Sequence, residues 1–179
     1  GVARGYFNEA LVLQVHAAIK AGIEASGARI DAFYHCPHHP REGPPPYRAD
    51  CDCRKPRPGM ILAAAAQHGI DLPSSVVVGD ALRDLEAGRN AGVGACVLVR
   101  TGKGRASESM ALGRGLADGV VDSIADLPAW IEARDAGGVH QEQRARSRMG
   151  EHHSRDAAQQ REQRADDEHV PREPRSARP

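Results

Sequence analysis

The stretch VVVGDALRDLEAGRNAGVGACVLV, residues 76–99, decides the fold. It begins with three valines and ends in the apolar run 95–99. Uninterrupted apolar runs of this length are typical of strands in a parallel sheet that is buried on both faces. Residues 82–91 between them predict a helix that ends at Gly92. A strand, a helix and a second strand in this order predict an α/β fold, a parallel sheet flanked by helices.

Further elements extend this unit in both directions. Toward the C-terminus, a strand near 119–121 precedes a helix that Ser123 caps and that continues to Ala133. Toward the N-terminus, Pro58 stands at the start of a helix that stops before Gly69. Residues 30–34 predict a short buried strand, and Asn8 is a good N-cap for a helix that ends near Gly27. Ligands of such sheets gather at the carboxyl ends of the strands.

Four side chains of the kind that bind zinc stand in one proline-rich stretch, residues 36–57, which we call the Cys/His loop. Cys36 and His38 form a C-x-H pair, and Cys51 and Cys53 form a C-x-C pair. Thiolates and imidazole are the usual ligands of a closed tetrahedral zinc site, although the spacing is tighter than in common zinc fingers. We predict a zinc ion here. The alternatives are reduced thiols with a surface imidazole, or a disulfide, which nothing in the sequence favours.

Two neighbouring histidines and a fourth cysteine leave room for other ligand sets. His35 and His39 flank the array, and either of them could replace His38. We prefer His38 because its spacing from Cys36 mirrors that of the second pair. Cys96 lies within an apolar run, where a cysteine is usually a small buried hydrophobic residue.

Charged residues at the end of the Cys/His loop and after the strand at 76–78 indicate chemistry on an anion. Arg54 and Lys55 follow the last loop cysteine, and an arginine with a lysine suits a phosphate. Asp80 follows the strand at 76–78 and suits Mg²⁺, with helix capping as the simpler interpretation. Asp84, four residues on, fits a functional acid and an ordinary first-turn acid equally well.

Overall composition excludes several classes of function. Lys plus Arg and Asp plus Glu both number 24, so no net charge favours nucleic acid or an anionic membrane. No apolar stretch has the length of a membrane span and no leader opens the chain, so we expect a cytoplasmic protein. From about His140 the sequence is mixed in charge and poor in aliphatic residues. We therefore expect a domain at 1–135 and a disordered tail at 136–179.

The sequence resembles the haloacid dehalogenase (HAD) superfamily, in the zinc-loop branch that contains the heptose 1,7-bisphosphate 7-phosphatases and the histidinol phosphatases. The stretches that carry the resemblance are GVARGYF at 1–7, CPHHP at 36–40, CDCRKPRPGM at 51–60, VVVGDALRDLEAGRNAGV at 76–93 and VLVRTGKG at 97–104. It covers roughly residues 1–130. R-K-P-x-P-G-M and R-T-G-K favour the heptose branch.

This resemblance implies a Rossmann-like HAD fold and an Mg²⁺-dependent phosphatase that acts through an aspartyl-phosphate. By its motifs, Lys55 holds the transferring phosphoryl group and Asp80 ligates Mg²⁺. Arg54 contacts the substrate at the phosphate that is not cleaved, and the zinc ion is structural. The expected substrate is a phosphorylated heptose used for the cell envelope, and the expected protein is a monomer.

The chain departs from the family pattern in one respect. The family's nucleophile and acid/base aspartates stand in a D-x-D-G-T motif on a first strand, and no such motif occurs here. Gly1 aligns just after a second strand motif that binds phosphate. We therefore expect a copy that lacks the N-terminal strands and is inactive by itself. The competing hypotheses are a histidinol-phosphate phosphatase and a non-catalytic zinc-stabilised anion-binding remnant.

Overall fold

The computed structural model of the protein describes residues 1–137, of which Gly1–Leu127 form one compact unit and Pro128 begins a second. Residues 127–137 are helical. The remaining elements, in chain order, are α1 (Glu9–Ala25), α2 (Gly59–His68), β1 (Val76–Gly79), α3 (Leu82–Ala91), β2 (Ala95–Val99), α4 (Gly104–Gly113), β3 (Gly119–Val121) and the 3₁₀ turn η1 (Ile124–Asp126).

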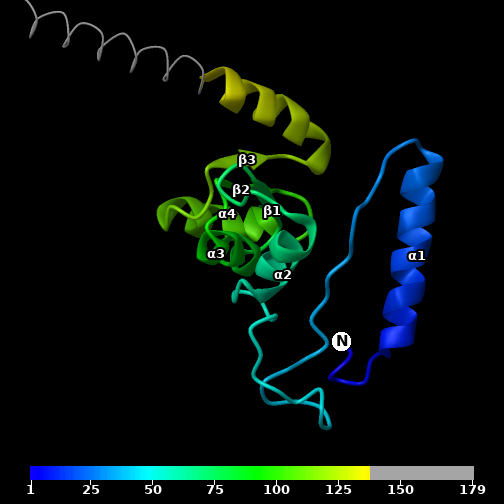
Figure 1. Cartoon of the computed structure of the whole chain (residues 1–179). Helices are drawn as coiled ribbons and strands as arrows, with labels where there is room; N and C mark the ends of the chain where they lie inside the picture. Colours follow the sequence, from blue (N-terminus) through cyan, green and yellow to red (C-terminus); the bar gives the residue numbers. More distant parts are fainter. Residues whose placement is uncertain (138–179) are drawn as a thin grey trace, which may run out of the picture. The chain divides into compact units, whose positions relative to one another are not determined.

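The three strands form one parallel sheet in the order β1-β2-β3 (Figure 1). Val77 stands opposite Cys96, and Leu98 stands opposite Val120. Parallel neighbours need a crossover, and α3 and α4 supply the two. The sequence prediction contained α3 with its observed bounds but omitted α4. The missed signal was the length of sequence between the strands at 95–99 and 119–121. Two parallel strands need a crossover element between them in the chain.

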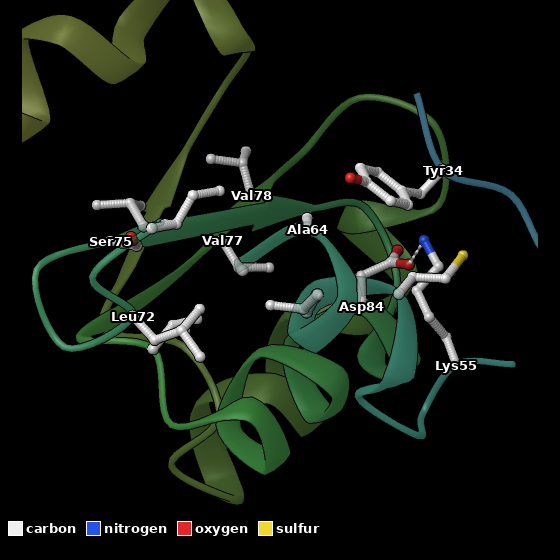
Figure 2. Close-up of a pocket in the computed structure, with 13 residues that line it drawn as sticks. Tyr34, Lys55, Ala64, Leu72, Ser75, Val77, Val78 and Asp84 are labelled. Carbon is white, nitrogen blue, oxygen red and sulfur yellow. Dashed lines mark ion pairs between the residues drawn. The ribbon is translucent and has the colours of Figure 1, made fainter. Parts of the chain in front are cut away.

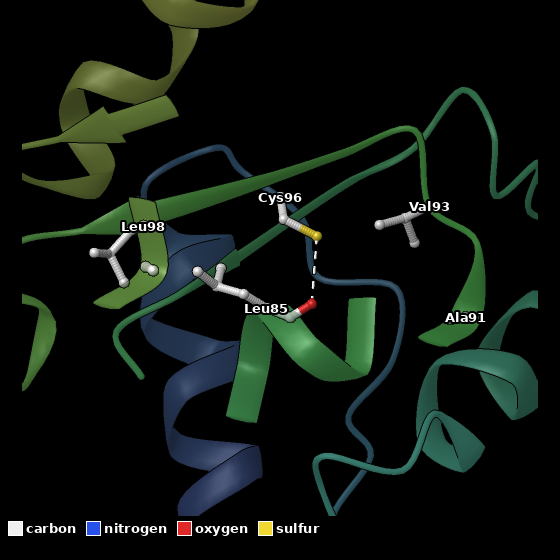
Figure 3. Packing of buried hydrophobic residues seen from close by; sticks show 6 residues of the cluster. Leu85, Ala91, Val93, Cys96 and Leu98 are labelled. Atoms are coloured by element: carbon white, nitrogen blue, oxygen red, sulfur yellow. Dashed lines mark hydrogen bonds between the residues drawn. The ribbon is translucent and has the colours of Figure 1, made fainter. Parts of the chain in front are cut away.

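The hydrophobic core lies where α3 and α4 pack against β2, with Leu85, Leu98 and Ala111 fully buried (Figure 3). Cys96 belongs to this core, and its thiol lies 3.5 Å from the carbonyl oxygen of Leu85. The prediction that Cys96 is a small buried residue is confirmed. All five residues of β2 are buried, as expected for a strand covered on both faces.

Helix ends follow the predicted signals closely. Asn8 caps α1 by accepting a hydrogen bond from the amide of Leu11 at 2.9 Å, and Ser123 caps η1 in the same way through Ala125. Gly69 and Gly92 close α2 and α3 with left-handed φ angles of 65° and 78°. Such angles favour glycine because it lacks a Cβ. The predicted caps of these helices are confirmed.

Two sequence predictions are wrong in detail. Residues 30–34 form no strand, because within residues 1–137 no neighbouring strand offers them a hydrogen-bond ladder. They run beside α1 instead, where the ring of Phe33 stacks on His16 at 4.5 Å. The helix predicted from Ser123 begins with one 3₁₀ turn and continues as an α-helix only from residue 127.

The C-terminal tail predicted at 136–179 lies outside the described residues, apart from its first two positions. The boundary near 135 therefore stays a prediction. Within residues 1–137, every helix is too short or too polar to cross a lipid bilayer.

Candidate active site

The side chains of Cys36, His38, Cys51 and Cys53 converge at one point of the Cys/His loop. Their ligand atoms all lie within 4.8 Å of one another. The sulfur of Cys53 lies 3.2 Å from that of Cys51 and 3.3 Å from that of Cys36, and Nδ1 of His38 lies 3.4 Å from it. All four cysteines of the chain are free thiols, which argues against the disulfide alternative.

This geometry fits a zinc ion. A tetrahedral ion with Zn–S bonds of about 2.3 Å has sulfur atoms about 3.8 Å apart. The observed sulfur separations, between 3.2 and 3.6 Å, are close to that edge length. Three thiols and one imidazole are also one of the usual ligand sets of a structural zinc site.

The two alternative histidines have other partners. Nε2 of His35 lies 3.3 Å from the carboxylate of Glu9, which also accepts a hydrogen bond from the hydroxyl of Tyr47. Nδ1 of His39 accepts a hydrogen bond from the amide of Glu42 at 3.0 Å. The geometry therefore favours His38 as the fourth ligand, as the sequence pattern does.

Ionisation of the cluster is uneven. Burial and the adjacent Cys51 and Cys36 thiols raise the pKa of Cys53 to about 12. Burial also opposes ionisation of Cys51, but hydrogen bonds from the two other thiols and from the amides of Arg54 and Cys53 together lower the pKa of Cys51. Holding all three sulfurs as thiolates requires a cation among them, and a zinc ion supplies that charge.

The residues after Cys53 are tied to the same cluster. Arg54 donates a hydrogen bond from Nη1 to the carbonyl oxygen of His38 at 2.9 Å. The amide of Gly59, the first residue of α2, donates to the carbonyl oxygen of Asp52 at 2.9 Å. A Cβ on Gly59 would lie 2.5 Å from that oxygen, so only glycine permits this approach. These contacts fix residues 54–58, at the end of the Cys/His loop, beside the cluster.

Lys55 reaches from this segment to α3. Its Nζ lies 2.6 Å from Oδ1 of Asp84, whose side chain is only 10% exposed. Oδ2 of Asp84 accepts a hydrogen bond from the amide of Ala81 at 3.2 Å and so belongs to the N-terminal cap of α3. One carboxylate therefore caps the helix and pairs with the lysine, and a functional role of Asp84 stays a prediction.

Asp80 stands between β1 and α3, at the carboxyl end of the sheet. Its Oδ2 accepts a hydrogen bond from the amide of Lys103 at 3.1 Å, in the turn that follows β2. The simpler interpretation, in which Asp80 caps α3, is wrong, since Ala81 is the N-cap residue. The carboxylate is directed instead toward the turn after the neighbouring strand.

A pocket of about 430 Å³ opens beside these charges (Figure 2). Lys55 and Asp84 stand at one end of it with Tyr34 close by, and Leu72 and Ser75 stand at the other. Residues of β1 form part of its wall, with apolar side chains of α2 beside them. The pocket is thus apolar along its length and charged at the end near Asp84.

One residue that supports the site carries no sequence signal. Asn90, near the end of α3, donates a hydrogen bond from Nδ2 to the carbonyl oxygen of Pro56 at 2.9 Å. This bond fixes the segment after Lys55 to the helix that carries Asp84. A single asparagine on an exposed helix face resembles any surface residue, so only the structure identifies its contact.

Comparison with known proteins places these features in one family. The HAD-hydrolase-like family model matches residues 52–127. The D-glycero-beta-D-manno-heptose-1,7-bisphosphate 7-phosphatase of Haemophilus influenzae is 47% identical over 128 residues, which are 72% of this chain and 67% of the relative. The protein of that name from Vibrio cholerae is 41% identical over 131 residues, covering 73% and 68%.

A solved structure agrees with these relatives. The D,D-heptose 1,7-bisphosphate phosphatase of B. bronchiseptica, crystallised with magnesium and phosphate, superposes with a TM-score of 0.63 and 34% identity. The superposition covers 75% of this chain and 70% of that one. With such identities over two thirds of its relatives, the chain belongs to the heptose 1,7-bisphosphate 7-phosphatase family of HAD-like phosphatases, hydrolases of phosphate monoesters.

Proposed function

We propose that the protein acts on the 7-phosphate of D-glycero-D-manno-heptose 1,7-bisphosphate, with Mg²⁺ as cofactor and zinc as a structural ion. The observation that carries this proposal is the ion pair of Lys55 with Asp84. Asp84 lies one helical turn after Asp80, which follows the carboxyl end of β1. An ammonium ion held by a buried carboxylate has a fixed position, which suits the binding of one phosphoryl group.

Each charged residue has a separate role in the proposal. Lys55 binds the phosphoryl group that is transferred, and Asp84 orients Lys55. Asp80 is the chain's Mg²⁺ ligand, because a carboxylate oxygen is the donor that a hard cation prefers. The bound Mg²⁺ neutralises phosphate charge. Arg54 contacts the second phosphate, and its bond to His38 ties that contact to the Cys/His loop.

The nucleophile is the part of the reaction that these residues do not supply. The resemblance assigns it to a D-x-D-G-T aspartate, and residues 1–179 contain no such motif. We therefore propose that these 179 residues bind metal and phosphate but do not hydrolyse the ester. Sequencing the DNA upstream of the Gly1 codon tests this directly. A D-x-D-G-T strand in frame supports the phosphatase, and an in-frame stop supports the non-catalytic remnant.

The substrate is tested by phosphate release with Mg²⁺ present. The β anomer of the heptose bisphosphate is the first substrate to use, because the relatives are named for it. The 179-residue chain should release no phosphate, whereas the product of a reading frame that contains the D-x-D-G-T strand should release one phosphate per heptose. Faster release from histidinol phosphate would replace the heptose proposal with the histidinol one. Release by the 179-residue chain would place the nucleophile within it.

A matched pair of variants locates the chemistry in the active product of such a frame. Lys55→Ala should nearly abolish turnover, because it removes the ammonium that binds phosphate. Lys20→Ala is the control, since Lys20 pairs with Glu24 on the exposed surface of α1. Full activity of Lys55→Ala would remove Lys55 from the site.

We also propose a cytoplasmic monomer. The four free thiols, three of them half-buried and one buried, support this location, because cysteines usually stay reduced in the cytoplasm. Sedimentation equilibrium of the purified chain tests the oligomeric state, and a mass above that of one chain would contradict the monomer.

A further inference from the structure

The turn after β2 lies directly against Asp80. The amide of Lys103 donates to Oδ2 of Asp80, and a Cβ built on Gly102 would stand 2.2 Å from the same oxygen. It would also stand 3.1 Å from Cγ and 3.4 Å from Cβ of Asp80. The whole side chain of Asp80 therefore occupies the space that a side chain at position 102 would need.

This turn cannot easily move away from Asp80. A Cβ on Gly104 would lie 1.7 Å from the carbonyl oxygen of Val99, so the backbone at 104 is pressed against the end of β2. The amide of Gly104 also donates to the carbonyl oxygen of Thr101 at 3.0 Å and closes the turn. An added methyl group at position 102 therefore displaces the side chain of Asp80 and not the backbone of the turn.

We propose that Gly102 is a positioning residue for the metal-binding carboxylate of Asp80. With glycine at this position, the turn after β2 supports Oδ2 of Asp80 through the Lys103 amide and leaves the other oxygen for Mg²⁺. This inference rests on the proposed function, in which Asp80 binds Mg²⁺. A side chain at position 102 moves the carboxylate and weakens metal binding while the fold persists.

A second glycine provides the control. Gly102 has a φ of 60°, so alanine there introduces backbone strain as well as the contact with Asp80. Gly115 has a φ of 63°, and a Cβ there would meet no atom within 4 Å. Gly115→Ala therefore carries the same strain without touching the site. The difference between the two variants isolates the contact with Asp80.

The experiment measures Mn²⁺ binding to the zinc-loaded chain by electron paramagnetic resonance, with Mn²⁺ as the probe for the Mg²⁺ site. The variants are Gly102→Ala, Gly115→Ala and Asp80→Asn, and each is checked for zinc content and thermal midpoint. Gly102→Ala should bind Mn²⁺ roughly tenfold more weakly than wild type, the usual effect of losing the support of a metal ligand. Gly115→Ala should bind like wild type, with a thermal midpoint lowered as much as in Gly102→Ala.

Each outcome has one meaning. Equal Mn²⁺ affinity in Gly102→Ala and Gly115→Ala overturns the inference while leaving the Mg²⁺ role of Asp80 intact, provided that Asp80→Asn abolishes binding. Unchanged binding in Asp80→Asn, or none in wild type, overturns the metal role of Asp80 and this inference with it.

A second measurement does not depend on the folding of Gly102→Ala. Asp80→Ala removes the acceptor of the Lys103 amide, so hydrogen exchange followed by NMR should show faster exchange at Lys103. The amide of Gly115, which donates to Leu112 in a different turn, should exchange as in wild type. Unchanged exchange at Lys103 would mean that the turn does not support Asp80, and the proposal would fail.

Discussion

Lys55 Nζ lies 2.6 Å from Oδ1 of Asp84, and this ion pair joins the end of the Cys/His loop to the first turn of α3. Asp84 is a buried charged residue, whereas the Lys55 side chain is 42% exposed. The carboxylate therefore has few other partners, and the ammonium stays accessible from the pocket.

Replacing Asp84 with asparagine should destabilise the protein moderately. Lys55 loses its charged partner, but half of the pair is open to solvent, so we expect the free energy of unfolding to fall by about 1–2 kcal/mol. Urea unfolding measures it. Glu86→Gln is the control on the same helix, because Glu86 pairs with the exposed Arg114 and should change stability by less than about 0.5 kcal/mol. Equal losses would mean that burial of Asp84 contributes nothing.

Zinc should bind with one ion per chain, as measured by elemental analysis. Cys53→Ser should lower the zinc content because it removes one thiolate from the set, and amides of residues 36–57 should then exchange faster with solvent. Cys96→Ala is the matched cysteine control, since Cys96 is buried in the core away from the cluster. A purified chain without zinc would refute the site.

Gly59→Ala should destabilise the junction of the Cys/His loop with α2. The new Cβ would meet backbone atoms of Asp52 and Cys53, which cannot rotate away, so we expect a loss of about 1–3 kcal/mol. Gly113→Ala in α4 meets nothing within 4 Å and should be neutral or stabilising by up to about 1 kcal/mol. Denaturant midpoints distinguish the two. A neutral Gly59→Ala would show that the junction is loosely packed.

Glu108 should contribute to the loss of stability in acid. Hydrogen bonding and charge from Arg100 lower the pKa of Glu108, and Arg100 also pairs with Asp122. Because the pKa is lower in the folded state, the contribution is complete above the unfolded value, about 4.3, and disappears as pH falls through the folded value. The stability of Glu108→Gln should therefore fall less steeply than that of wild type below about pH 4.3. Parallel pH profiles of unfolding would contradict this.

Much of the fold was predictable because its signals are local. Three valines before a glycine, and a helix closed by Gly92, carry their strand and helix patterns within a few residues. The strand expected at 30–34 is not formed, because a strand needs a hydrogen-bonded partner and no strand within residues 1–137 pairs with this segment. Residues with β-type composition and no ladder run as extended chain.

The candidate site divides in the same way. The four residues of the metal cluster were predictable because ligand chemistry is a property of residue types, and the role of Lys55 stays a prediction. The partner of Lys55 was not, because Asp84 has two local explanations and only the fold brings the lysine to it. The contact of Gly102 was invisible as well, since it involves a side chain 22 residues away that a neighbouring strand brings beside it.

The Cys/His loop also bears on the order of folding. Its four ligands span only residues 36–53, so the chain entropy lost on bringing them together is small. Pairing β1 with β2 must wait for a complete crossover helix. Metal capture by a short loop can thus precede formation of the sheet, and Arg54 and Lys55 would then be held in place before β1 pairs with β2.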